Sequence, residues 1–160
     1  MRRVVTRWRA GSFILVSSRA TRTELADVLA RPQIQRMAVA PVDELAPGVE
    51  RFSEHVPGVL SLSGVCRDAK DDKFLACAVE GNAHYLVSSD YDLLDIRQYE
   101  NVAVVNPGQF LIALELYSMD AVAMAERFSP DVLTDIQTTL PLESTTAARV
   151  AAALAALSDE

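Results

Sequence analysis

Acidic side chains lie where the loops of a parallel α/β sheet would converge. Each follows an apolar run or lies on the helical segment beside one, and the set consists of Glu24, Asp68, Asp71, Asp72, Asp90 and Asp92. Ligands of an open parallel sheet bind beyond the carboxyl ends of its strands. We therefore expect Glu24, Asp72 and Asp90 to meet at one end of the sheet.

Carboxylates that share a pocket repel one another unless a cation holds them together. Mg²⁺ and Mn²⁺ prefer oxygen ligands, and such an ion polarises a phosphoryl oxygen and lowers the pKa of a water that attacks it. The pattern thus indicates phosphodiester hydrolysis. A structural interpretation stays open beside it, because acidic residues also suit helix N-termini and turns, as at 71–72 and 90–92. Glu24 would then be the partner of Thr21 in a capping box.

Apolar runs alternate with helical segments along the chain. We predict strands at 13–16, 85–87 and 102–105, and an ambiguous extended segment at 59–65. Helical patterns cover 2–10, 18–30, two short stretches within 33–56, then 71–80, a stretch from Pro107, and 119–127, 130–138 and 145–157. This alternation implies crossover connections, and hence an α/β fold with a parallel sheet.

Length and composition indicate one core with an appendage. A chain of 160 residues, 50% of them hydrophobic, is too short for two ordinary domains. Alanine becomes frequent near the C-terminus, so we predict a domain at 1–116 and a helical extension at 117–160. No apolar run approaches the roughly 18 residues of a membrane span, and no signal-peptide pattern is present. We expect a soluble cytoplasmic protein with no membrane partner, and buried, reduced thiols at Cys66 and Cys77.

The net charge of −7 is unevenly distributed. Residues 1–31 contain seven arginines and two acidic residues, a balance of +5, which leaves −12 for the remainder. A basic edge beside an acidic pocket is compatible with a metal-dependent nuclease, and equally with an ordinary solvated helix face. Charge alone therefore does not distinguish a nuclease from an ordinary solvated helix face.

Two segments carry most of the family information, CRDAKDDKFLA at 66–76 and YLVSSDYDLL at 85–94. Together they resemble the acidic signature of PIN-domain proteins that form the toxin component of toxin–antitoxin systems. Weaker matches on either side extend the resemblance over about residues 4–114.

The resemblance implies a PIN-like three-layer α/β/α fold and Mg²⁺- or Mn²⁺-dependent cleavage of RNA. It implies catalytic roles for Glu24, Asp72 and Asp90, which with Asp92 would bind the ion. Supporting roles would fall to Asp71, Asp68 and Ser89, with Ser88 or Ser89 in place of a common Thr or Gly. The implied partners are an RNA substrate, a cognate antitoxin protein and a second copy of the chain.

One departure from the family pattern bears on activity. PIN domains begin with a strand that ends in an Asp, whereas the first acidic residue of this chain is Glu24. We therefore expect an N-terminally truncated domain that lacks its first strand, either because further residues lie upstream or because the member is degenerate. Loss of one ligand of this kind ordinarily removes most activity, so we expect an impaired nuclease.

A non-catalytic interaction protein is the competing hypothesis. A degenerate PIN scaffold could use the helices of 117–160 to bind a partner or itself, since their apolar face must be covered. An upstream reading frame that encodes the missing strand would favour the nuclease, and its absence would favour the interaction protein.

Overall fold

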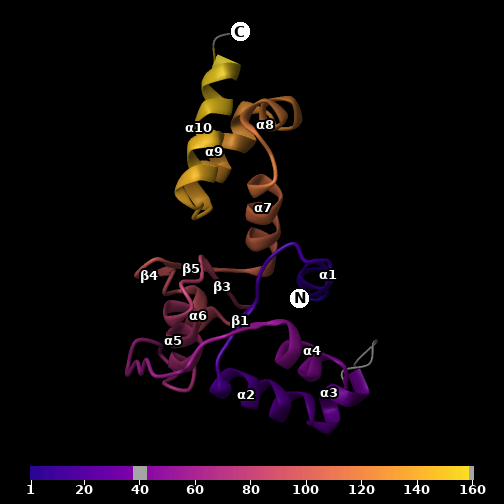
Figure 1. Ribbon diagram of the computed structural model, residues 1–160. Helices are drawn as coiled ribbons and strands as arrows, with labels where there is room; N and C mark the ends of the chain where they lie inside the picture. Colours follow the sequence, from indigo (N-terminus) through magenta and orange to yellow (C-terminus); the bar gives the residue numbers. More distant parts are fainter. Residues whose placement is uncertain (38–42, 159–160) are drawn as a thin grey trace. The chain divides into compact units, whose positions relative to one another are not determined.

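The computed structural model describes residues 1–37 and 43–158, apart from the side chain of Met37. The chain divides into two compact units, Met1–Val104 and Val105–Glu160, which we describe separately (Figure 1). The predicted boundary between 116 and 117 falls within the second unit, because the helix that begins at Pro107 groups with the C-terminal helices.

The first unit alternates short strands with helices. Its elements are α1 (Arg2–Arg9), β1 (Val16–Ser17), α2 (Arg19–Leu29), α3 (Pro32–Met37), α4 (Leu45–Phe52), β2 (Glu54–His55), α5 (Asp72–Glu80), β3 (Tyr85–Val87), α6 (Tyr91–Leu94), β4 (Gln98–Tyr99) and β5 (Val102–Val105). The predicted strands at 85–87 and 102–105 are confirmed, as are the two short helices within 33–56. The apolar run at 13–16 is strand only at its last residue.

The strands form two small sheets in the described part of the chain. β1 pairs with β2 in parallel, with Val16 opposite Glu54. The second sheet has the order β3-β5-β4, and β4 is antiparallel to β5. The fold is thus α/β with parallel strands, as predicted. The predicted single parallel sheet is instead two small sheets, one of which contains an antiparallel pair. β2 and β4 are two residues long and carry no apolar run that could predict them.

Helix α5 lies at the centre of the first unit. Leu75 is fully buried on its inner face, and the core around it includes Cys66, Ala78, Leu93, Val102 and Val104. At its C-terminal end, α5 approaches β1 so closely that a Cβ at Gly81 would collide with Val16 Cγ1. A glycine is therefore needed there, and the close approach fixes α5 against the strand that precedes α2.

The N-terminus of α2 corrects one prediction. The capping box consists of Ser18 and Thr21, and not of Thr21 and Glu24: the Thr21 N–H donates to Ser18 Oγ, and the Ser18 N–H donates to Thr21 Oγ1. Ser18 follows β1 directly, so the helix begins three residues earlier than a cap at Thr21 would allow. Glu24 then lies a full turn further on and is free for a contact outside its own helix.

The second unit is helical beyond Val105. It contains α7 (Pro107–Tyr117), α8 (Ala121–Arg127), α9 (Pro130–Thr139) and α10 (Ser144–Ser158), as the sequence predicts. Side chains cap each helix: Asn106, Asp120 and Ser129 are N-caps, and Glu143 accepts from the first turn of α10. α10 packs on α8 and α9, and the fully buried apolar side chains are Leu116, Met124, Leu133, Val150 and Ala153.

None of the described helices is long and apolar enough to cross a lipid bilayer.

Candidate active site

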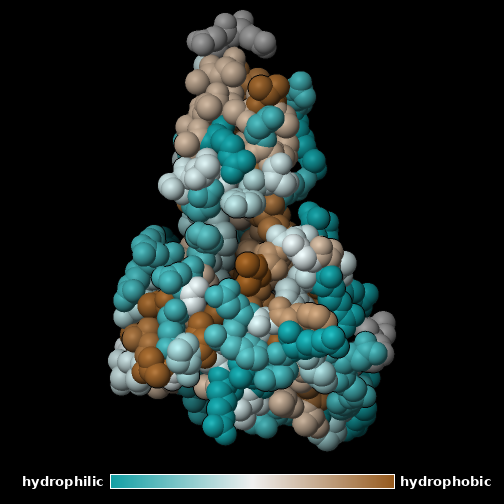
Figure 2. Space-filling view, in the orientation of Figure 1, coloured by the Kyte–Doolittle hydropathy of each residue, from teal (hydrophilic) through white to brown (hydrophobic). Residues whose placement is uncertain are grey.

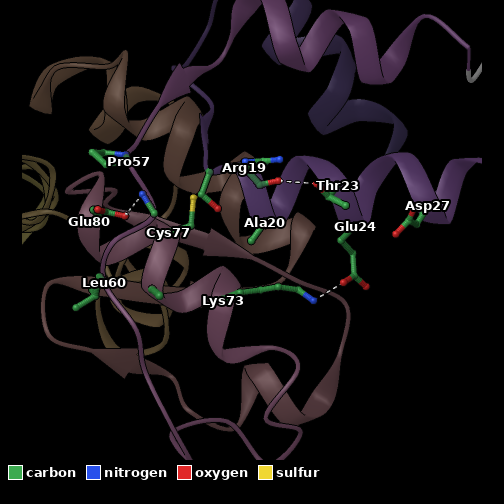
Figure 3. Close-up of a pocket in the computed structure, with 13 residues that line it drawn as sticks. Arg19, Ala20, Thr23, Glu24, Asp27, Pro57, Leu60, Lys73, Cys77 and Glu80 are labelled. Atoms are coloured by element: carbon green, nitrogen blue, oxygen red, sulfur yellow. Dashed lines mark hydrogen bonds and ion pairs between the residues drawn. The ribbon is translucent and has the colours of Figure 1, made fainter.

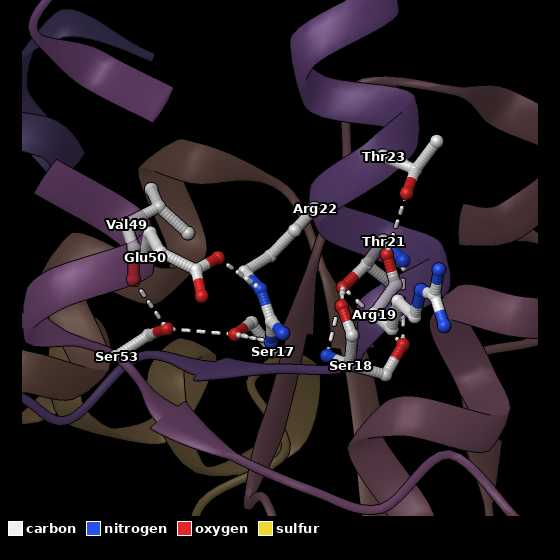
Figure 4. A network of polar contacts seen from close by, with 9 residues as sticks. All are labelled: Ser17, Ser18, Arg19, Thr21, Arg22, Thr23, Val49, Glu50 and Ser53. Carbon is white, nitrogen blue, oxygen red and sulfur yellow. Dashed lines mark hydrogen bonds and ion pairs between the residues drawn. The ribbon is translucent and has the colours of Figure 1, made fainter. Parts of the chain in front are cut away.

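A satisfied polar network joins the beginning of α2 to α4 (Figure 4). Arg22 Nη1 donates to Ser17 Oγ at 3.0 Å, and Arg22 Nε lies 2.5 Å from Glu50 Oε2. Ser17 Oγ in turn bonds Ser53 Oγ at 2.7 Å, and Ser53 Oγ donates to the Val49 carbonyl. We call these four side chains, Ser17, Arg22, Glu50 and Ser53, the serine network. It holds α2 in place beside β1 and β2.

Asp72 has a buried side chain whose two oxygens are both engaged. The Gly64 N–H donates to Oδ2 at 2.8 Å, and the Cys66 N–H donates to Oδ1 at 2.7 Å. The residue is only 3% exposed, and these backbone donors hold the pKa of its carboxyl below the ordinary value. Asp72 therefore secures the segment before α5 and points away from solvent.

Cys66 lies against the same carboxyl. Burial raises the pKa of its thiol to about 12, and a hydrogen bond to Asp72 adds to the shift. Both Cys66 and Cys77 are buried and free of disulfides, as predicted. A thiol held neutral in this way is a poor metal ligand and a poor nucleophile, so Cys66 serves packing and the support of Asp72.

Glu24 projects from α2 towards α5 and binds Lys73 Nζ through Oε2 (Figure 3). The two residues are separated by 49 positions, which explains why no spacing rule anticipates the pair. Lys73 Nζ also lies 5.4 Å from the ring centre of Phe74. This single cation thus connects the helix that carries Glu24 with the helix that begins at Asp72.

Asp90 and Asp92 lie at the N-terminus of α6, directly after β3. Asp90 is the N-cap and accepts from the Asp92 N–H at 2.9 Å, while its own N–H donates to Ser88 Oγ. Asp92 Oδ1 lies 2.5 Å from Arg67 Nη1. Of the two predicted ligands, Asp92 therefore has a cationic partner, and Asp90 is exposed at the loop. Neighbouring Ser89 is exposed as well.

Asp71 is the residue at which the acidic side chains act on one another. Partial burial raises the pKa of its carboxyl, and the charges of Asp68, Asp90 and Glu24 raise it further. Lys73 opposes the shift. The negative charges that act on Asp71 thus come from α2, from the loop before α5 and from the loop after β3. We call Glu24, Asp68, Asp71 and Asp90 the acidic group.

The acidic group has the donor chemistry of a site for a hard divalent cation. Its ligands are all carboxylate oxygens, and their mutual repulsion at Asp71 is the effect that an added positive charge would relieve. In residues 1–37 and 43–158, however, no three His, Cys, Asp or Glu side chains come close enough to hold an ion. The acidic group thus fits Mg²⁺ or Mn²⁺ by charge and donor type, but its side chains would have to move closer together to coordinate an ion.

A family model described as PIN domain matches residues 1–92. The chain belongs to the PIN domain family. Proteins of this family are typically nucleases and generally use divalent metals. No curated protein matches the chain, and no solved structure does.

The PIN domain also contains an open hollow of about 610 Å³ between α2, α5 and the segment 57–60 (Figure 3). Glu24 and Lys73 line one end of it, and Cys77 and Glu80 line the other. Glu80 accepts from the N–H groups of Gly58 and Val59, so its carboxylate is already used to hold that segment. Of the predicted site residues, only Glu24 lines the hollow.

Sequence reasoning missed one residue of this PIN domain, Lys73, and gave another, Asp71, only a supporting role. Lys73 stands next to Asp72 within a charged run, where nothing distinguishes it from a solvated lysine. Asp71 was predicted to support Asp72, yet Asp71 is the one that feels the neighbouring carboxylates. The adjacent pair at a helix N-terminus gives no periodic signal to tell which of the two points inward, since both suit that position.

Proposed function

We propose that this PIN domain is a divalent-metal-dependent ribonuclease and acts as the toxin component of a toxin–antitoxin pair. The observation that carries the proposal is the placement of like charges. The charges of Glu24 from α2 and Asp90 after β3 both raise the pKa of the Asp71 carboxyl before α5, in a chain of a family whose members are typically nucleases. Buried or crowded like charges that the fold leaves unmatched are typical of functional sites.

Within the proposal, Glu24, Asp71 and Asp90 are the ligands that face the ion. Asp68 is exposed beside them and supports the site. Asp72, a ligand in the family-based expectation, serves instead to hold the segment 64–66 by its two backbone hydrogen bonds.

Asp92 keeps an outer position in the proposed site. Its carboxylate is paired with Arg67, and its N–H donates to Asp90 Oδ1. It therefore holds the Asp90 carboxylate at the N-terminus of α6. Ser88 holds the backbone of the same turn by accepting the Asp90 N–H, while Ser89 is exposed next to it.

A divalent ion bound here would supply the positive charge that polarises a phosphodiester and lowers the pKa of an attacking water. The chain's own residues have two further tasks. The carboxylates must hold their positions against repulsion, which α5 and the capped turn at Asp90 help to ensure. Lys73 must release Glu24 or share it with the ion, since the ammonium group and the metal ion would compete for the same carboxylate.

A non-catalytic PIN scaffold is the second proposal. It is favoured by the two ion pairs that give predicted ligands a protein partner, Glu24 with Lys73 and Asp92 with Arg67. In that case the partner surfaces, including any contact with an antitoxin or a second copy, would be the function. Membership of the PIN domain family is also what supports the proposed RNA substrate, antitoxin partner and dimer.

The deciding experiment is a calorimetric titration of Mn²⁺ into the chain, followed by cleavage of a fluorogenic RNA. We expect saturable binding that Asp71→Asn and Asp90→Asn each weaken at least about tenfold, since each removes a charged ligand. Cleavage should fall by about a hundredfold or more in both. The matched control is Asp95→Asn, which removes an exposed carboxylate from the other end of α6.

The two proposals give different outcomes. Binding that survives both substitutions, or that Asp95→Asn abolishes equally, would contradict the metal-dependent nuclease. A folded chain that binds no Mn²⁺ would favour the non-catalytic scaffold. Fold is checked by the far-ultraviolet circular dichroism of every variant.

A further inference from the structure

Helix α1 has two faces of opposite character. At 100° per residue, Val4, Val5 and Trp8 fall on one side, and the four arginines fall on the other. These arginines are Arg2, Arg3, Arg7 and Arg9, and we call them the arginine face. All four are exposed, whereas Val4 is only 8% exposed.

The apolar side of α1 is held by the protein itself. Trp8 is half-buried, and its ring atom Cη2 lies 3.7 Å from the point where a Cβ at Gly48 of α4 would stand. The indole therefore lies close to α4 at Gly48, at a distance where even an added Cβ would make only an ordinary van der Waals contact. With its apolar side against the protein, α1 presents the arginine face outward. Figure 2 shows mostly hydrophilic side chains where α1 lies in Figure 1.

The arginine face has no counter-charge in the described residues. The ion pairs found there involve Arg22, Arg67, Lys73 and Arg127, and none involves α1. The chain contains 22 acidic residues, so a shortage of acidic residues does not explain the unpaired arginines. The helix dipole favours Arg7 and Arg9, which lie in the last turn, but it does not explain the other two arginines. Arg2 and Arg3 lie in the first turn, where the helix dipole disfavours positive charge and no acidic residue offsets it.

We propose that the arginine face binds the phosphate backbone of RNA. This inference rests on the proposed nuclease function and names a surface that would hold its substrate outside the acidic group. Guanidinium groups suit phosphate because they donate two parallel hydrogen bonds to it. An RNA bound only at clustered carboxylates would be repelled, and a row of four guanidinium groups on the same unit offsets that repulsion. A membrane surface fits less well, because the apolar side of α1 is already engaged.

The test measures binding of a fluorescein-labelled oligouridine by anisotropy over a series of salt concentrations, in EDTA so that no cleavage occurs. The variant is Arg3→Gln/Arg7→Gln, which neutralises two arginines that lie one turn apart on the arginine face and keeps good helix formers. The control is Arg31→Gln/Arg36→Gln, which removes the same charge from exposed positions elsewhere in the unit. Circular dichroism verifies that both variants stay folded.

For single strands, the slope of log affinity against log salt changes by about 0.7 per lost phosphate contact, so we expect it to become shallower by about 1.4 in the α1 variant. The control should keep the parent slope. Equal slopes in all three proteins, equal losses in both variants, or no binding of oligouridine by the parent would each overturn the inference. So would retained RNA binding with lost binding to anionic vesicles, which would assign the arginine face to a membrane. Because EDTA removes the ion, these outcomes are independent of the Mn²⁺ titration that tests the nuclease.

Discussion

Helix α2 contributes to two polar regions that differ in how their charges are matched. In the serine network, the Arg22 guanidinium meets one carboxylate, Glu50, and donates to Ser17 as well. In the acidic group, Lys73 pairs with Glu24, and no other carboxylate of the group has a cationic partner in the described residues. One region is electrostatically complete, and the other carries three carboxylates in excess.

The difference indicates which region serves the fold and which serves a ligand. Folded chains pair their crowded polar groups, because an unmatched charge lowers the stability of the native state. The serine network follows that rule over a distance of 36 residues, from Ser17 to Ser53. Where the rule is broken, as at Asp71, a bound cation is the simplest means to restore it.

Asp72 gives the strongest test of this comparison. It is adjacent to Asp71, yet both oxygens of its carboxylate already have hydrogen-bond donors. Asp72→Asn should lower the unfolding midpoint by many degrees, since an amide has one acceptor oxygen for the two N–H groups of Gly64 and Cys66. Asp71→Asn should leave the midpoint unchanged or raise it slightly, because it removes repulsion. Thermal unfolding followed by the fluorescence of Trp8, the single tryptophan, measures both.

The lowered pKa of Asp72 also sets the sign of its pH dependence. The folded state favours the charged carboxylate, so this stabilisation is present above the ordinary pKa and is lost as pH falls through the lowered value. The parent should therefore lose stability in this acid range, and Asp72→Asn should lose less. If the two proteins declined in parallel, or if Asp71→Asn were the less stable variant, the roles of the two residues would be reversed.

Much of the fold could be predicted because its signals are local. The apolar runs at 85–87 and 102–105, and the proline that opens the helix at Pro107, lie within the elements they define. β2 and β4 could not be predicted, since two-residue strands are specified by their partners and not by their own pattern. From sequence, Ser18 and Thr21 are both possible N-caps of α2. Ser18 takes the position because β1 ends at Ser17, directly before it.

The candidate site could be predicted as a set of acidic residues and not as a geometry. The sequence places carboxylates after strands, which singles out Glu24 and Asp90, two residues whose charges act on Asp71. It cannot tell which of two adjacent aspartates turns towards backbone donors, because those donors come from the loop at 64–66. Nor can it find Lys73 as the partner of Glu24, since long-range ion pairs leave no trace in local spacing.

The serine network offers the next largest test. Arg22→Gln removes the charge that Glu50 meets and the donor that Ser17 Oγ accepts, and should destabilise the first unit by about 1–3 kcal/mol. The control is Arg19→Gln, one turn earlier on α2 and exposed, which should change stability by less than about 0.5 kcal/mol. Urea unfolding monitored by Trp8 fluorescence measures the difference. A similar small effect of both substitutions would show that the contacts of Arg22 contribute little to stability. Neither substitution should change Mn²⁺ binding.

The smallest effect is expected at Lys73, which is the only cation that the acidic group meets in the described part of the chain. Its contact with Glu24 is partly exposed, so the pair is worth at most about 1 kcal/mol. Lys73→Met frees Glu24 for the ion and should tighten Mn²⁺ binding by up to about fivefold, the same energy expressed as an affinity. The control is Lys70→Met, which removes the same charge from an exposed position three residues earlier. An equal gain in both variants would reflect net charge alone, and a loss in Lys73→Met would mean that this lysine supports the site. A gain confined to Lys73→Met would show that the lysine and the metal ion compete for one carboxylate, as the contrast with Arg22 and Glu50 requires.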